Sequence, residues 1–281
     1  MNEEKFTVRA LKDGDRAGAV AVEAAAMPGH RYLDDAWDLF TKKSKGALSG
    51  VFAGSEIIGI GKLTVLYGNF GWLETLRVDP EWQSQGAGKA LYRSWAKEAE
   101  ALGLTQVGMY TGATNVVSRH LAEINGLHMA GAYGEFTRAV RPLTKEECSD
   151  FVQVSPAEGE ACLSPCYPEM KGGFLCLNQT YYPVGPGLGT CMAENGWLYT
   201  DGTTMLVLGA RFQPEAGLFL PFLSGDAGKA LTFADALAYR SGAALIRSVL
   251  SEEQTPYGEG FAATERKTIT LWGKLKKEDV L

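Results

Sequence analysis

The chain has 281 residues, of which 46% are hydrophobic and 21% are charged, and its formal net charge is −6 at pH 7. This length suits two domains of ordinary size, and the composition excludes a disordered or collagen-like chain. Neither half of the sequence is basic, so nothing supports binding to a phosphate backbone, and we expect no nucleic-acid partner.

The sequence also argues against membrane, secretory and metal-binding classes. No run of 18 apolar residues could span a bilayer, and the first residues lack the apolar segment of a signal peptide. We therefore expect a cytoplasmic protein with no membrane partner. The five cysteines form no CxxC pair and the three histidines are scattered, so we expect reduced thiols and no metal.

Alternating apolar and polar residues predict strands over 6–11, 48–53, 57–67 and 71–78, with a hairpin turn at 54–56. A helix is predicted over 17–26, where Asp13 and Asp15 offer caps. Asp79-Pro80 ends the fourth strand, because proline cannot donate to the ladder.

The clearest helix is predicted over 86–102, where Leu91 and Trp95 fall on one apolar stripe. A strand over 104–110 follows. A further helix, 115–125, would bury Val117, Leu121 and Ile124. Strands and helices in this order predict a mixed α/β fold.

The second half of the sequence echoes the first. The pentapeptide AGKAL occurs at 87–91 and again at 227–231, each time after an apolar strand and before a helix and a further strand. VRAL at 8–11 has a counterpart, VRPL, at 140–143. Chance is the alternative, but two matches in the same order favour a duplicated chain with domains 1–139 and 140–281. Residues 155–168 are expected to form an irregular loop.

The loop that joins strand 71–78 to helix 86–102 carries the strongest chemical signal. Two glycines let the main chain approach a ligand closely, and the first N–H groups of a helix form an anion site suited to a pyrophosphate. A Walker A loop is excluded by Gln83 and Ala90, and a dinucleotide fingerprint by Leu91.

The pattern that remains, Gln/Arg-x-x-Gly-x-Gly/Ala, is met by Gln83, Gly86 and Gly88. With its flanking strand and the later helix that begins at Asn115, the sequence from about 8 to 140 resembles the GNAT superfamily of acetyl-CoA-dependent N-acetyltransferases. The resemblance implies a mixed, largely antiparallel sheet in which the parallel strands 71–78 and 104–110 splay apart around the thioester. Duplication would make the chain a tandem GNAT-like protein with a degenerate second half.

The same resemblance implies acetyl-CoA as cosubstrate and assigns its contacts. Main-chain groups of Leu76, Arg77 and Val78 would pair with the pantetheine arm, and Asn115 would reach the pantetheine or the acetyl end. The loop residues implied around the pyrophosphate are Gln83, Ser84, Gln85, Gly86, Ala87, Gly88 and Lys89.

Amine acetylation needs a base for the amine proton and an acid for the departing thiolate. Glu74 is the candidate base, with a solvated or salt-bridged strand residue as the alternative. The tyrosine that many family members place seven residues after the capping Asn is replaced by Ala122. Tyr110 is then the candidate acid, and His120 is more typical of a surface residue. If neither residue serves, the thiolate departs unassisted or the protein does not turn over.

Two other segments bear on the acceptor and on the second half. Residues 27–37 would build the acceptor site, or form an ordinary capped helix with Trp37 and Phe40 packed inward. In the second half, the strand-to-helix loop is short and contains Asp226, which would repel a pyrophosphate, so a structural role is expected there. The glycine-rich residues 185–189 are interpreted as a turn, without a strand before or a helix after them.

These observations predict an N-acetyltransferase that moves an acetyl group from acetyl-CoA to a primary amine of a small molecule or peptide by direct attack. A non-catalytic acyl-CoA-binding sensor or scaffold is the alternative, and the failed Walker pattern disfavours a kinase. The sequence does not identify the acceptor or the oligomeric state, and a homodimer is among the assemblies that it allows.

Overall fold

The computed structural model describes residues 5–29, 31–142 and 150–276. The chain forms two compact units, each built from more than one stretch of sequence. The first comprises Met1–Met109, Asn115–Met129 and Leu271–Leu281, and the second comprises Tyr110–Thr114 and Ala130–Thr270. A division into independently folding domains after residue 139 stays a prediction.

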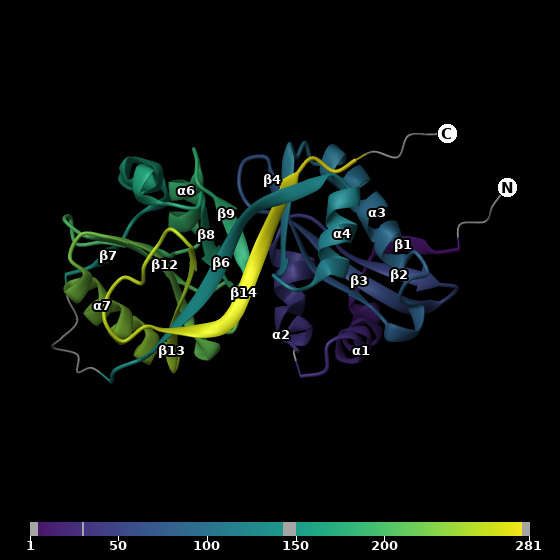
Figure 1. Ribbon diagram of the computed structural model, residues 1–281, viewed down its shortest axis with the longest axis horizontal. Coiled ribbons are helices and arrows are strands. Elements are labelled where there is room, and N and C mark those ends of the chain that lie inside the picture. Colours follow the sequence, from purple (N-terminus) through teal and green to yellow (C-terminus); the bar gives the residue numbers. More distant parts are fainter. Residues whose placement is uncertain (1–4, 30, 143–149, 277–281) are drawn as a thin grey trace. The chain divides into compact units, whose positions relative to one another are not determined.

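The first unit is built on a sheet whose strands follow the order β1-β2-β3-β4-β5 (Figure 1). The pairs from β1 to β4 are antiparallel, whereas β4 and β5 are parallel. The strands are β1 (Thr7–Ala10), β2 (Leu48–Ala53), β3 (Glu56–Val65), β4 (Phe70–Val78) and β5 (Gln106–Gly112).

Helices cover both faces of this sheet. Ile60 of β3 packs in a core with Ala19, Leu33 and other side chains of the first two helices. A Cβ on the next residue, Gly61, would overlap the ring of Trp95 in the third helix, so this position needs glycine. Because successive strand residues face opposite ways, α1 and α2 lie on one face and α3 on the other. The helices are α1 (Arg16–Ala26), α2 (Leu33–Asp38) with a π-helical turn (Leu39–Lys43), α3 (Ala87–Ala101) and α4 (Val116–Ile124).

The second unit has a sheet in the order β14-β6-β13-β12-β11-β10-β7 and a separate hairpin, β8-β9. Strands β12 and β13 are parallel. The longer strands are β6 (Leu127–Ala139), β11 (Met205–Gly209), β12 (Leu218–Ser224), β13 (Leu245–Ser251) and β14 (Ala262–Gly273). The shorter strands are β7 (Val152–Gln153), β8 (Phe174–Leu177), β9 (Thr180–Pro183) and β10 (Leu198–Thr200). The helices are α5 (Pro156–Leu163), α6 (Leu188–Glu194) and α7 (Ala227–Arg240).

A strand, a helix and a parallel strand follow one another in both units. In the first unit they are β4, α3 and β5, and in the second they are β12, α7 and β13. Each AGKAL pentapeptide begins the helix of its unit. The predicted fold class, a mixed and largely antiparallel sheet with a parallel pair, is confirmed.

One expected loop is wrong, and the expected surroundings of a second are wrong although it does contain a turn at 186–187. Residues 155–168 are mostly helical, because Pro156–Leu163 forms α5 and Ser164–Glu169 forms a 3-10 helix. Ser155 followed by proline at the first helical position is a helix start that composition alone does not reveal. Residues 185–189 do lie between a strand and a helix, and Gly187 caps α6 with a φ of 94°.

The predicted buried face of α4 is also wrong. Val117 is 76% exposed and Ile124 is 39% exposed, whereas Ala122 is fully buried. The helix therefore buries its small residue and leaves two of the three predicted apolar side chains exposed.

Among the described cysteines, Cys162, Cys166 and Cys176 are free thiols, and Cys148 lies outside the described residues. Within 5–29, 31–142 and 150–276, no helix has the length and apolar character needed to cross a membrane.

Candidate cofactor and acceptor site

The parallel strands β4 and β5 pair over only three residues. Their ladder ends at Trp72 and Gly108. At this end the ring of Trp272 lies 5.7 Å from that of Trp72, and it occupies the space that a Cβ on Gly108 would need. Beyond this point, β4 has no ladder partner on the side turned away from β3 among the described residues, which agrees with the splay that the resemblance implies.

A β-bulge shapes the free part of β4. Ile60 pairs with Arg77 and Lys62 with Glu74, so Thr75 and Leu76 together oppose the single residue Gly61. Thr75 adopts a φ of 61°, which is rare for a β-branched residue. A bulge leaves an extra residue outside the ladder and turns its main-chain groups away from the neighbouring strand.

The ladder also fixes where the main-chain groups near Val78 point. The amide of Asp79 donates to the carbonyl of Ile58 over 2.9 Å, so hydrogen-bonding groups face β3 at Asp79 and Arg77. Because these directions alternate along a strand, Leu76 and Val78 direct their N–H and C=O groups toward the open edge. Such an edge accepts an extended amide-containing chain as an added strand, and the pantetheine arm of coenzyme A is one.

The loop after β4 is held by its own side chains. The carboxylate of Asp79 accepts a hydrogen bond from the amide of Glu81 over 2.9 Å. The side-chain amide of Gln83 donates to the carbonyl of Val78 over 3.2 Å, and that of Gln85 donates to Glu81 over 2.8 Å. These hydrogen bonds stabilise the conformation of the loop between the end of β4 and the start of α3.

At the start of α3 the main chain offers unpaired donors. Gly86 caps the helix with a φ of 100°, and the first intrahelical hydrogen bond runs from the amide of Ala90 to the carbonyl of Gly86 over 3.0 Å. The amides of Ala87, Gly88 and Lys89 therefore have no partner inside the helix, and the helix dipole adds positive potential. A Cβ on Gly88 would lie 3.0 Å from Leu121 of α4, so glycine allows the start of α3 to pack closely against α4.

These features fit the diphosphate and pantetheine of coenzyme A. The start of α3 provides N–H donors without partners inside the helix, and the loop joins it to the edge of β4 at Leu76 and Val78. Asn115 begins α4, and its side-chain oxygen accepts a hydrogen bond from the amide of Ser118 over 3.1 Å. Asn115 thus acts as a helix cap in this structure.

Glu74 lies on β4 just before the bulge. Its Oε1 accepts a hydrogen bond of 2.6 Å from Thr64, and Lys62 stands directly opposite it on β3. Lys62 is fully buried, and its Nζ donates to the carbonyl of Gly46 over 2.6 Å. Thr64 cannot be identified as a site residue from the sequence, because no pattern distinguishes it from any other threonine in a strand.

The other candidates for proton transfer lie in different surroundings. Tyr110 is half-buried and belongs to the second unit, where its ring lies 6.3 Å from that of Tyr181. His120 is exposed on α4, as a surface residue would be. Ala122, at the position of the usual tyrosine, is fully buried and carries no acid.

The segment after α1 leads into α2, whose aromatic side chain packs inward and whose start has no side-chain cap from its N-cap residue, Tyr32. Trp37 is 1% exposed and donates to Asp13 over 2.9 Å, and Phe40 is fully buried. This packing of Trp37 and Phe40 was predicted, and an acceptor role for residues 27–37 stays a prediction. His30 lies outside the described residues.

A buried carboxylate that the sequence analysis missed holds the start of α2. Glu23 is 1% exposed, and its two oxygens accept hydrogen bonds of 3.2 and 3.1 Å from the amide of Leu33. The hydroxyl of the preceding residue, Tyr32, lies 2.8 Å from that of Thr75. The segment is thereby linked to the bulge of β4.

The corresponding region of the second unit is closed by its own side chains. The carbonyl of Pro221 on β12 accepts a hydrogen bond from the hydroxyl of Tyr257 over 2.7 Å. The carbonyl of Leu220 accepts one from the hydroxyl of Ser248, also over 2.7 Å. At the start of α7, Asp226 accepts from the amide of Lys229 over 3.0 Å. Proline has no N–H and Asp226 is negative, so this edge is poorly suited to coenzyme A.

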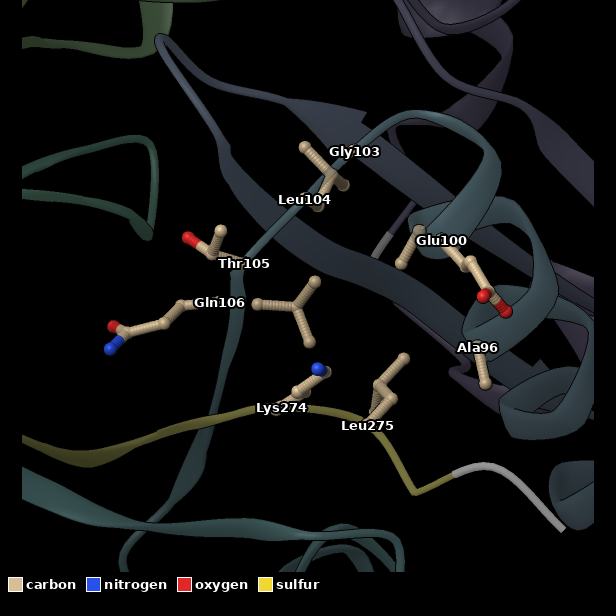
Figure 2. A pocket seen from close by; sticks show the side chains of 10 residues that line it. Ala96, Glu100, Gly103, Leu104, Thr105, Gln106, Lys274 and Leu275 are labelled. Atoms are coloured by element: carbon tan, nitrogen blue, oxygen red, sulfur yellow. The ribbon is translucent and has the colours of Figure 1, made fainter.

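A cavity of about 200 Å³ lies at the far end of α3, beside Glu100, Gly103 and Lys274 (Figure 2). The 15 residues of α3 separate this end from Gly86 by about 20 Å. The cavity is therefore distinct from the loop at the start of α3. No group of three or more His, Cys, Asp or Glu in the described stretches could hold a metal ion.

Comparisons with known proteins agree with this geometry. Residues 6–127 match the model of the Acetyltransferase (GNAT) family. No curated protein sequence matches the chain.

Solved structures resemble the chain over most of its length. A tandem GNAT protein from the clavulanic acid biosynthesis pathway is 13% identical, with a TM-score of 0.59 over 98% of this chain and 99% of that one. A GCN5-related N-acetyltransferase from Sphaerobacter thermophilus is 12% identical, with a TM-score of 0.57 over 99% and 98% of the two chains. One from Kribbella flavida is 16% identical, with a TM-score of 0.53 over 95% and 70%. Residues 6–127 are therefore similar to the Acetyltransferase (GNAT) family, and the chain as a whole has a GNAT-like fold.

Proposed function

We propose that this protein transfers an acetyl group from acetyl-CoA to a primary amine of a small molecule or peptide by direct attack. The observation that carries the proposal is the open edge of β4 at Leu76 and Val78, which leads into the unpaired amides at the start of α3. One continuous surface thus offers strand pairing for an amide-containing arm and donors for a diphosphate.

In this proposal the main chain does most of the binding. The amides of residues 84–89 hold the diphosphate, with Gly86 and Gly88 keeping side chains away from it. Leu76 and Val78 pair with the pantetheine arm, which brings the thioester toward the bulge at Thr75. An N–H released by the bulge then stabilises the negative charge that develops on the thioester oxygen.

Glu74 takes the proton of the attacking amine, directly or through a water molecule. Its hydrogen bond from Thr64 holds the carboxylate in place, and its position before the bulge is close to where the thioester would lie. Tyr110 is the proposed donor of a proton to the thiolate. Since Ala122 supplies no acid, departure of the thiolate without a proton donor is the alternative within this mechanism.

A sensor or scaffold that binds acyl-CoA without turnover is a second candidate. It is favoured by one observation, the buried Ala122 at the position of the usual acid. Both candidates predict coenzyme A binding, and they differ in whether thiol is released.

Calorimetry with CoA and a thiol-release assay with acetyl-CoA and a panel of amines separate these proposals. Binding together with amine-dependent thiol release supports the transferase. Binding without release on any amine supports the sensor. Absence of CoA binding by the folded protein would overturn both.

A further inference from the structure

Arg77 is a half-buried cation with no counter-charge among the described residues. One terminal nitrogen donates to the carbonyl of Leu76 over 2.8 Å. Its Nε is buried and has no hydrogen-bond partner. No ion pair joins Arg77 to any residue in the described part of the chain.

The position of Arg77 places this cation beside the open edge. It pairs with Ile60, whose side chain lies in the core beneath α1 and α2, so the arginine side chain starts on that face of the sheet. Its hydrogen bond to Leu76 brings the guanidinium to a carbonyl that faces the open edge. Glu74, the proposed base, lies three residues earlier on the same strand.

Burying a guanidinium N–H without a partner is unfavourable, and a bound anion would remove that cost. The planar fork of arginine matches a carboxylate through two parallel hydrogen bonds. After the bond to Leu76, Nε and the other terminal nitrogen of Arg77 make no hydrogen bond to described residues, and together they form one such fork.

The diphosphate of the cosubstrate is not the anion that this fork suits. Its proposed donors lie at the start of α3, and α3 packs on the opposite face of the sheet, against Gly61. The face that carries Arg77 is the one covered by α1 and α2, where Tyr32 contacts Thr75. An anion on this face would belong to the acceptor.

We propose that Arg77 binds a carboxylate of the acceptor, and that the acceptor is an amino acid or another small amine that carries a carboxylate. This inference rests on the proposed acetyl transfer and names the substrate class of the same site. It excludes polyamines as preferred acceptors, because they bring only positive charge to the guanidinium.

The test compares each acid with its own amide. L-amino acids, β-alanine and 4-aminobutyrate are assayed for acetylation beside the matching carboxamides. An amide lowers the basicity of the neighbouring amine and leaves more of it unprotonated, so amine basicity alone favours the amide. For at least one pair, we expect kcat/KM to favour the acid by roughly 10- to 100-fold, as a hydrogen-bonded charged group would give.

Variants assign this preference to one side chain. Arg77→Gln should remove the preference for the acid by lowering kcat/KM for the acid to about that of its amide. Arg77→Lys keeps the charge but not the fork and should restore part of the preference. Arg16→Gln is the matched control, because Arg16 is 44% exposed and pairs with Asp34 on the outer side of α1.

A second readout does not depend on acetyl transfer. The same acids and amides are titrated by calorimetry into the protein saturated with CoA, and wild type should bind the acid more tightly. Equal binding of every acid and its amide would overturn this inference, as would an Arg77→Gln variant whose only defect is weaker CoA binding. Tighter binding of an acid without any turnover would instead count against the proposed transferase and leave carboxylate recognition standing.

Discussion

The hydroxyl groups of Tyr32 and Thr75 lie 2.8 Å apart and join the segment before α2 to the bulge of β4. Thr75 is 4% exposed and has a positive φ, so this contact holds a strained residue in place. The carboxylate of Glu23 accepts hydrogen bonds from the amide of Leu33 and so holds the start of α2, next to Tyr32. The hydrogen bonds of Tyr32 and Glu23 thus hold the start of α2 against the bulge of β4.

Removing the hydroxyl of Tyr32 should loosen the bulge. Tyr32→Phe leaves the Thr75 hydroxyl buried without this partner, and we expect the free energy of unfolding to fall by about 1–2 kcal/mol. If the bulge aligns the thioester, kcat should fall several-fold with little change in KM for acetyl-CoA. Urea unfolding and steady-state kinetics measure the two effects.

The control for that variant is Tyr239→Phe, because Tyr239 is 56% exposed on α7. It should change neither quantity. A Tyr32→Phe protein with wild-type stability and kcat would show that the link is incidental.

Replacing the proposed base should slow the chemical step and leave cofactor binding intact. Glu74→Gln keeps the shape of the side chain and can still accept the hydrogen bond from Thr64. Because general-base catalysis contributes about 10²- to 10⁴-fold, we expect a fall in kcat of that order. CoA affinity measured by calorimetry should stay within about twofold, and undiminished turnover would assign the base elsewhere.

Adding one methyl group at the start of α3 should weaken coenzyme A binding. Gly86→Ala puts a side chain on a residue whose φ is 100°, which costs of the order of 1–2 kcal/mol and disturbs the row of amides. We expect the Kd for CoA, measured by calorimetry, to rise at least about tenfold.

Gly103 provides the matched control at the other end of the same helix. Its φ is 69° and a Cβ there would meet nothing within 4 Å, so Gly103→Ala carries a similar strain away from the loop. It should lower stability without changing CoA affinity. An equal loss of affinity in both variants would indicate a general effect of strain on the unit.

Much of this site is predictable from sequence, because its parts follow local rules. Strand periodicity, the proline after Asp79 and the glycines at 86 and 88 indicate a strand, a loop and a helix mouth without any tertiary information. These signals lie within a stretch of about twenty residues. That is why the loop and the order of its elements agree with the structure.

The features that were missed depend on contacts between distant segments. Nothing in the local sequence marks Thr75 as a residue with positive φ, and the buried state of Glu23 follows from its contact with Leu33 ten residues later. The exposure of Val117 shows the same limit, since helical spacing predicts a face but not which neighbour covers it. Likewise, β5, β6 and β14 each contribute residues to both units, and composition does not reveal such a boundary inside a strand.

In the second unit, one buried carboxylate holds α7 to the sheet. Asp235 is fully buried and accepts hydrogen bonds from Arg138 of β6 over 2.6 and 2.8 Å and from Arg141 over 2.9 Å. Burial raises the pKa of Asp235, but the bonds from the two arginines outweigh it and hold the pKa below its ordinary value.

Because the folded-state pKa is lowered, Asp235 stabilises the fold at pH values above its ordinary pKa, and this contribution is lost as the pH falls through the folded value. Asp235→Asn leaves Arg138 buried without its charge partner, and we expect a loss of about 3 kcal/mol near pH 7. The difference from wild type should shrink below about pH 4, the ordinary range of an aspartate. Amide exchange of α7 and β13 across this pH range measures it, with Glu215→Gln, an exposed carboxylate, as the control. A variant that differs from wild type equally at every pH would show that the destabilisation comes from packing and not from the charge of Asp235.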